Sequence, residues 1–152
     1  MYIPEYKPNG KEIAVVKTSK GDIRVQLMGE DAPIHVGNFV ELAQKGFYDN
    51  LKFHRYVPNF VIQGGCPNTR DLDSEQVKAA EGNPYAGLGT GGPGYTIKEE
   101  YTTNPHNKHL DGTLAMARSQ ILILLALSFT SVLVLSLSWI QAILCSVRQL
   151  RD

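Results

Sequence analysis

Apolar and polar residues near the start of the chain alternate with a period of two, which predicts a β-hairpin. Residues 13–18 form a run rich in β-branched side chains, and residues 23–27 alternate apolar with polar positions. Between them, Ser-Lys-Gly-Asp at 19–22 is a typical turn sequence. We therefore expect two antiparallel strands in this region.

The following segment has the spacing of a helix. Its apolar side chains recur three and four positions apart, at Val36, Phe39, Val40 and Ala43. Asp31 is the candidate N-cap, and Pro33 suits the first turn, where its missing N–H needs no partner. Gly46 predicts the end of the helix.

Shorter strands are expected after the helix. Residues 52–56 and 60–63 predict two strands joined by a Pro-Asn turn, and residues 95–98 and 113–117 predict two more. Residues 71–94 are rich in glycine and polar side chains and are expected to form a long loop. A mainly β chain with helices in this order is typical of an antiparallel β-barrel with a helix over one open end.

The pattern changes abruptly after Gln120. Residues 121–147 hold no charged side chain over 27 positions, and arginines flank them at positions 118, 148 and 151. Because Leu, Ile and Ala favour helix locally, we expect an apolar helical tail. Its length would suffice for a transmembrane span, and Trp139 lies near one end, as an interfacial anchor would.

Composition narrows the functional classes. Lys+Arg and Asp+Glu number 15 each, so no basic surplus indicates nucleic-acid binding. The two cysteines, Cys66 and Cys145, make neither a disulfide framework nor a CxxC zinc motif, and we expect no metal and no cofactor. The N-terminus carries no apolar core of signal-peptide type, which favours a cytoplasmic location.

The most informative stretch is residues 53–65, Phe-His-Arg-Tyr-Val-Pro-Asn-Phe-Val-Ile-Gln-Gly-Gly. It places a fixed cation and an aromatic ring five residues apart on two apolar strands. Together with Gly-Thr-Gly-Gly at 89–92 and Gly-Thr-Leu-Ala-Met-Ala at 112–117, it resembles the cyclophilins, the peptidyl-prolyl cis-trans isomerases. The resemblance covers roughly residues 12–120 and implies a cyclophilin-like antiparallel β-barrel.

This resemblance implies roles for individual residues. Rotation about an X-Pro bond crosses a barrier of roughly 18–20 kcal/mol, because it breaks amide resonance. A guanidinium aimed at the prolyl nitrogen stabilises the twisted amide more than the planar one, and Arg55 is the candidate catalytic donor. The substrate-binding residues that the resemblance implies are Phe60, Val61, Gln63, Met116, Ala117 and Arg118.

Two of these positions depart from the family pattern. Val61 stands where many members carry methionine, so the pocket should be slightly less filled. Arg118 stands where many eukaryotic members carry a peptide-binding asparagine, a position that varies among bacterial-like members. We interpret His54 as structural, because the isomerisation transfers no proton, and Cys66 as a small buried residue.

The resemblance also gives the tail a second interpretation. In the family the barrel continues with further strands beyond the segment that matches Met116-Ala117. Read one base away with permitted codons, residues 121–133 become DPDSAGSQFYFCL, and later codons yield TVFG; both carry landmarks of the absent half. We therefore interpret the chain as an N-terminal extension (1–11), a truncated cyclophilin-like domain (12–120) and a frameshifted apolar tail (121–152).

The expected function is peptidyl-prolyl isomerisation that assists protein folding. Its partners would be proline-containing peptides and unfolded proteins, with cyclosporin-type molecules as further candidate ligands. Because the later strands supply the floor of the proline pocket in the family, we expect weakened activity in the chain as written. The alternative is a cyclophilin-like peptide-binding module without catalysis, anchored in a membrane through residues 121–147.

Overall fold

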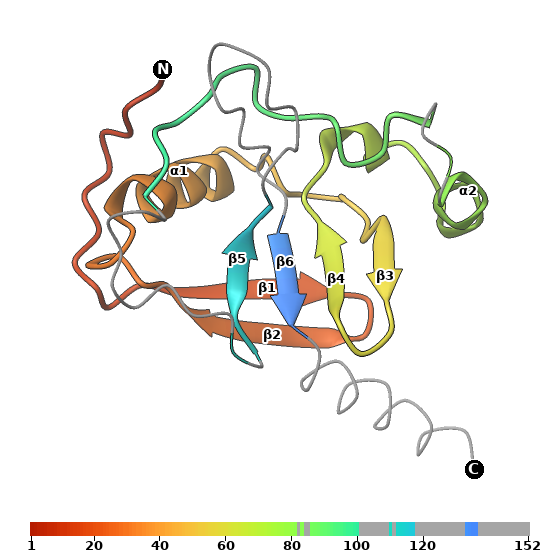
Figure 1. Cartoon of the computed structure of the whole chain (residues 1–152), viewed down its shortest axis with the longest axis horizontal. Helices are drawn as coiled ribbons and strands as arrows, with labels where there is room; N and C mark the ends of the chain where they lie inside the picture. Colours follow the sequence, from red (N-terminus) through yellow and green to blue (C-terminus); the bar gives the residue numbers. More distant parts are fainter. Residues whose placement is uncertain (82, 84–85, 101–109, 111, 118–132, 137–152) are drawn as a thin grey trace.

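The computed structural model describes the chain except residues 82, 84–85, 101–109, 111, 118–132 and 137–152, and it describes residues 133–136 by their backbone alone. Within the described residues the chain forms two antiparallel sheets, two α-helices and one short 3-10 turn (Figure 1). The first sheet is a hairpin, and the second has four strands. The strands of the hairpin run across the direction of the others in Figure 1.

The N-terminal hairpin confirms the expectation from the alternating pattern. Strand β1 spans Ile13–Thr18 and strand β2 spans Gly21–Gln26, with Ile13 opposite Gln26 and Thr18 opposite Gly21. Along β1, exposed positions alternate with half-buried ones, and no residue of either strand is fully buried. The hairpin is therefore a thin, partly covered element and not the centre of the core.

Helix α1 spans Pro33–Gln44 and carries buried core residues at Val36 and Leu42. It ends as expected, because Gly46 follows the C-cap residue with a φ of 70°. The expected start was wrong by one residue. The N-cap is Ala32 instead of Asp31, and no N-cap side chain bonds to the first turn.

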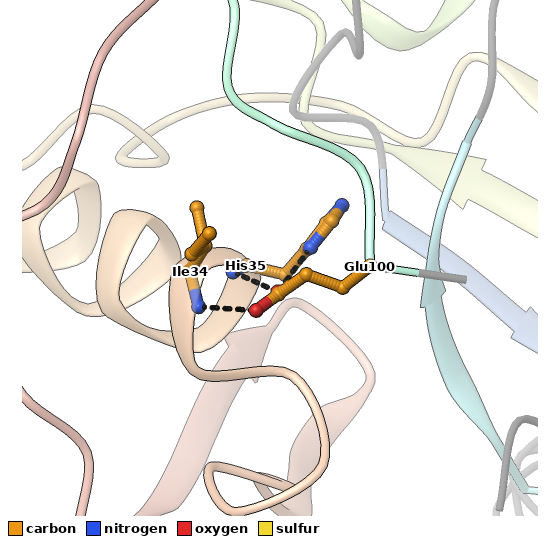
Figure 2. A network of polar contacts seen from close by, with 3 residues as sticks. All are labelled: Ile34, His35 and Glu100. Carbon is orange, nitrogen blue, oxygen red and sulfur yellow. Dashed lines mark hydrogen bonds and ion pairs between the residues drawn. The ribbon is translucent and has the colours of Figure 1, made fainter. Parts of the chain in front are cut away.

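A distant carboxylate covers the start of α1 in place of a local cap (Figure 2). Glu100 accepts hydrogen bonds from the backbone N–H groups of Ile34 and His35, each at 2.9 Å. His35 Nδ1 also lies 2.6 Å from Glu100 Oε2. The first turn of α1 holds no acidic residue. Glu100, only 8% exposed, thus supplies the negative charge that a helix N-terminus favours.

The N-terminal extension is part of the fold. We call residues 1–9 the N-terminal strap, because Glu41 of α1 binds this segment at Tyr2, Glu5 and Tyr6. The Glu41 carboxylate accepts hydrogen bonds from the backbone N–H of Glu5 at 2.6 Å and of Tyr6 at 2.8 Å, and from the Tyr2 hydroxyl. The hydrogen bond from Tyr2 is the leading cause that lowers the pKa of Glu41. The same bond, with Glu41 accepting, raises the pKa of Tyr2 to about 12.

The strap also touches the segment that leads to Glu100. The Tyr2 ring lies 4.3 Å from the Tyr95 ring, measured between centroids, and Tyr2 N donates to Thr96 O at 2.7 Å. A Cβ at Gly37 would lie 2.7 Å from the Tyr6 carbonyl oxygen, so glycine at this position of α1 permits the close approach. The expected strand at 95–98 reduces to a single parallel bridge between Tyr2 and Ile97.

The second sheet has the strand order β3-β4-β6-β5, with every neighbouring pair antiparallel. Its strands span Arg55–Val57 (β3), Val61–Gly64 (β4), Leu114–Met116 (β5) and Leu133–Ser136 (β6). The expected barrel is not closed among the described residues, which form two open sheets instead.

Strand β6 corrects the expected helical tail. The helix assignment is wrong for residues 133–136, because β4 and β5 offer backbone partners on both sides of this short run and override its local helix preference. The other residues of the tail lie outside the described part of the chain. Within that part, no helix combines the length and apolarity needed to cross a membrane.

The expected loop at 71–94 contains a helix that the analysis of the sequence missed. Helix α2 spans Ser74–Ala80 after the short 3-10 turn Pro67–Thr69. Asp73 accepts from Gln76 N, and the Gln76 side chain accepts from Asp73 N, each at 2.8 Å. This reciprocal capping box was readable in the sequence and was overlooked.

Candidate active site

The candidate site is built on the hairpin formed by β3 and β4. Arg55 begins β3 and lies opposite Gln63 of β4. Because directly opposed residues point to the same face of a sheet, the two side chains meet, and Arg55 Nη1 donates to Gln63 Oε1 at 3.2 Å. Arg55 is exposed. The bond to Gln63 engages one of the five guanidinium N–H donors.

The turn of this hairpin presents an aromatic ring. Asn59 adopts a φ of 57°, a left-handed conformation that asparagine tolerates, and Phe60 N donates to Val57 O at 3.1 Å. Phe60 follows the turn with 60% of its surface exposed, whereas Val61 is 6% exposed and belongs to the core. Of the two expected groove residues, Phe60 is therefore available to a ligand, and Val61 faces inward.

The second part of the expected site lies across the same sheet. Met116 ends β5 and Ala117 follows it, and both are half-buried. Between β5 and the Arg55–Gln63 hairpin lies β6, so two strand spacings, roughly 10 Å, separate β4 from β5. Arg118 lies outside the described residues. The structure thus joins Arg55 to Gln63 directly and places Met116 and Ala117 on the far side of β6.

His54 lies behind this face, next to Arg55. It is 6% exposed, and burial, followed by the neighbouring Arg55 cation, lowers its pKa. Within the described part of the chain, His54 Nδ1 has no hydrogen-bond partner. A neutral, buried imidazole agrees with the structural role that we expected.

The loop that contains Gly89 packs against the His54 ring. A Cβ placed at Gly89 would lie 3.0 Å from His54 Nε2, so the backbone passes directly over the ring. Gly89 N donates to the sulfur of Cys66 at 3.2 Å, and Cys66 is fully buried as a free thiol, as expected. Gly89 thereby packs against two residues that flank the hairpin, His54 before β3 and Cys66 after β4.

Residues that the sequence analysis missed support the outer edge of the site. Tyr56 N, on the open edge of β3, donates to Glu81 Oε1 at 3.4 Å. Glu81 is the C-cap residue of α2. The overlooked helix therefore brings a carboxylate to the backbone beside Arg55. The capping box of α2 was the only signal for this arrangement that the sequence contained.

Comparison with known proteins links this chain to one family. Residues 13–123 match the model of the cyclophilin type peptidyl-prolyl cis-trans isomerase/CLD family. A peptidyl-prolyl cis-trans isomerase of Synechococcus elongatus is 47% identical over 106 residues, which cover 70% of this chain and 59% of that protein. One from Helicobacter pylori is 45% identical over 106 residues, covering 70% and 53%. Peptidyl-prolyl cis-trans isomerase B of Bacillus subtilis is 47% identical over 97 residues, covering 64% and 54%. The chain spans somewhat more than half the length of these relatives.

Proposed function

This chain belongs to the cyclophilin-type peptidyl-prolyl cis-trans isomerase family, and on that basis we propose that it catalyses rotation about X-Pro peptide bonds and so assists protein folding. One observation carries the proposal. An exposed guanidinium, Arg55, donates a hydrogen bond to Gln63 on the β3–β4 hairpin, inside the region that matches the family.

Rotation about a peptide bond requires positioning and charge, because no bond to the enzyme is formed. As the amide twists, the prolyl nitrogen regains a lone pair, and an Arg55 N–H directed at that nitrogen stabilises the twisted state. Gln63 fixes the guanidinium and offers its remaining groups to the substrate backbone. The exposed ring of Phe60 supports the proline ring from the turn of the hairpin.

The remaining groove residues would complete the pocket. Ala117 would contribute apolar surface, and Arg118 would border the peptide. Val61 is buried, and Met116 lies one residue beyond the register row of Arg55, Gln63 and Ala115 and so points to the opposite face of the sheet; both would support the pocket from within the core. Proline-containing segments of peptides and unfolded proteins are the proposed substrates, and cyclosporin-type molecules would compete for the same groove. We place the protein in the cytoplasm and assign the activity to residues 12–120. The chemistry uses no metal and no cofactor.

We also propose that residues 121–152 arose by loss of one nucleotide near the Gln120 codon. The family match supports this origin, because it ends at residue 123 while the relatives are longer than the matched region. The gene sequence tests it directly. An open neighbouring frame that encodes the GSQF and TVFG landmarks is expected. Stop codons in that frame would refute the frameshift and leave the tail as a membrane-anchor candidate.

The catalytic proposal is tested with a protease-coupled assay on a short Ala-Pro peptide. Arg55→Ala should lower kcat/KM about a hundredfold, because loss of one preorganised donor has an effect of that order. Arg24→Ala, which removes an exposed guanidinium on β2, is the matched control and should leave the rate unchanged. Equal rates for both variants would contradict the role of Arg55. A wild-type chain no faster than the uncatalysed reaction would contradict the activity itself.

A further inference from the structure

Strand β5 carries part of the proposed groove but has few attachments. Its three residues pair with β6, and no other strand of the described chain pairs with it. Met116 ends this strand and Ala117 directly follows it. The position of the apolar side of the groove relative to Arg55 therefore depends on what occupies the place between β4 and β5.

That place is filled by four residues of the chain's own tail. Strand β6 is antiparallel to both neighbours and pairs with all four residues of β4 and all three of β5. One row of the register runs from Arg55 to Gln63, then through position 134 to Ala115. The tail thus joins the hairpin that holds the guanidinium to the strand that holds the apolar residues.

We infer that residues 133–136 are a positioning strand, which fits between β4 and β5 and sets the groove geometry through backbone hydrogen bonds. This inference deepens the proposed function, on which its catalytic part rests. Strands in a sheet bond through main-chain N–H and C=O groups, and every residue except proline supplies both. The place between β4 and β5 therefore requires an extended backbone and not particular side chains. An apolar segment of unrelated origin can therefore occupy it.

Removing β6 would have two consequences. The inner edge of β4 and the facing edge of β5 would both lose their partners, which leaves polar backbone groups unsatisfied. β4 would still pair with β3, whereas β5 would keep no strand partner among the described residues. Loss of β6 is therefore expected to release β5 selectively and to leave the Arg55–Gln63 pair in place.

Hydrogen exchange on the full chain tests this directly. Leu135→Pro removes one N–H from the centre of β6, and proline is not tolerated in a central strand. Those amides of Leu114–Met116 that donate to β6 should exchange at least about tenfold faster, which corresponds to the loss of one net hydrogen bond. The amides of Ile13–Thr18 in the separate hairpin should keep their rates. Leu144→Pro, the same change beyond the end of β6, is the matched control and should leave β5 protected.

Two further variants guard against unfolding of the whole domain. Leu135→Thr keeps the N–H and the strand preference, so β5 should stay protected from exchange. If this variant lost as much protection in β5 as Leu135→Pro, the claim that backbone hydrogen bonds hold β6 in place would be overturned. Leu135→Gly keeps the N–H but weakens the strand, and it should speed exchange in β5 several-fold without affecting β1. Equal changes in all strands, or none in β5, would overturn the positioning role.

A catalytic readout and a dilution series complete the test. Leu135→Pro should lower kcat/KM at least about tenfold, since small displacements of substrate-binding groups have effects of that size. Hydrogen exchange can be measured whether or not the protein is active. An inactive wild-type protein would therefore contradict the proposed catalytic function and leave the test of β6 as a positioning strand intact. Protection of β5 that disappears on dilution would show that the strand comes from a second copy, which would overturn the assignment to the chain's own tail.

Discussion

The carboxylate of Glu100 offers the sharpest test of how this fold is held together. We expect Glu100→Ala to destabilise the protein strongly, although residue 100 contributes nothing to the apolar core. Its Oε1 and Oε2 accept from two backbone N–H groups at 2.9 Å, and His35 Nδ1 lies 2.6 Å from Oε2. Removing the carboxylate leaves these donors at a partly buried helix start that has no local cap.

The magnitude follows from these contacts. A hydrogen bond to a charged group contributes about 1.5–3 kcal/mol, and loss of a helix cap costs about 0.5–2 kcal/mol. The contributions overlap, because Glu100 is itself the cap of α1, so a loss of about 3 kcal/mol is expected for Glu100→Ala. For a chain of this length that corresponds to a fall in Tm of roughly 10 °C. Glu100→Gln should cost less, because its amide oxygen still accepts one bond.

Urea unfolding followed by circular dichroism measures the change. Glu99→Gln is the matched control, since the adjacent Glu99 Oε2 is buried without a hydrogen-bond partner among the described residues. That variant should unfold at the wild-type urea concentration or slightly above it. If Glu100→Ala lowered the free energy of unfolding by less than about 0.5 kcal/mol, a level typical of surface changes, the distant cap would contribute nothing that water could not replace.

Two pH-dependent effects are expected from the shifted groups. The pKa of His54 in the folded protein is lowered below 6.5, so the unfolded chain binds the proton more tightly. Stability should therefore decline as pH falls from about 6.5 through the lowered pKa. His54→Gln should flatten this part of a plot of Tm against pH. The strap should detach at both extremes. The pKa of Glu41 is lowered, so the stability that its carboxylate gives to the strap's attachment is lost as pH falls below 4.5. The pKa of Tyr2 is raised, so the stability that its hydroxyl gives is lost as pH rises from 10.0 through about 12. Hydrogen exchange at the amides of Glu5 and Tyr6 measures whether the strap is attached. If these amides exchanged at the wild-type rate in Glu41→Gln at neutral pH, the result would contradict the role of Glu41 in holding the strap.

Local patterns predicted much of the fold. The hairpin at β1 and β2, helix α1 with its stop at Gly46, and the strands on either side of Pro58-Asn59 all follow from periodicity and turn residues close together in the sequence. The Arg55–Gln63 pair was also accessible, because both residues belong to one hairpin. These features depend on neighbours within a few positions.

The features that were missed depend on distant partners. Nothing around Pro33 indicates that Glu100 caps the helix, and nothing in the strap indicates that Tyr2 reaches Tyr95 and Glu41. Strand β6 was missed for the same reason, since its conformation is imposed by β4 and β5 against a local helix preference. Helix α2 is different, because its capping box was local and readable.

The distant cap on α1 has a consequence for the order of folding during synthesis. The ribosome delivers residues 33–44 long before residue 100, and a helix of 12 residues is marginal on its own in water. Until Glu100 emerges, the N–H groups of Ile34 and His35 must bond to water, and the strap cannot yet reach Tyr95. Helix α1 is therefore made early and completed late. A nascent chain halted before residue 100 would hold a frayed helix. A chaperone that binds such segments could bind α1 in the time between the synthesis of residues 33–44 and that of residue 100.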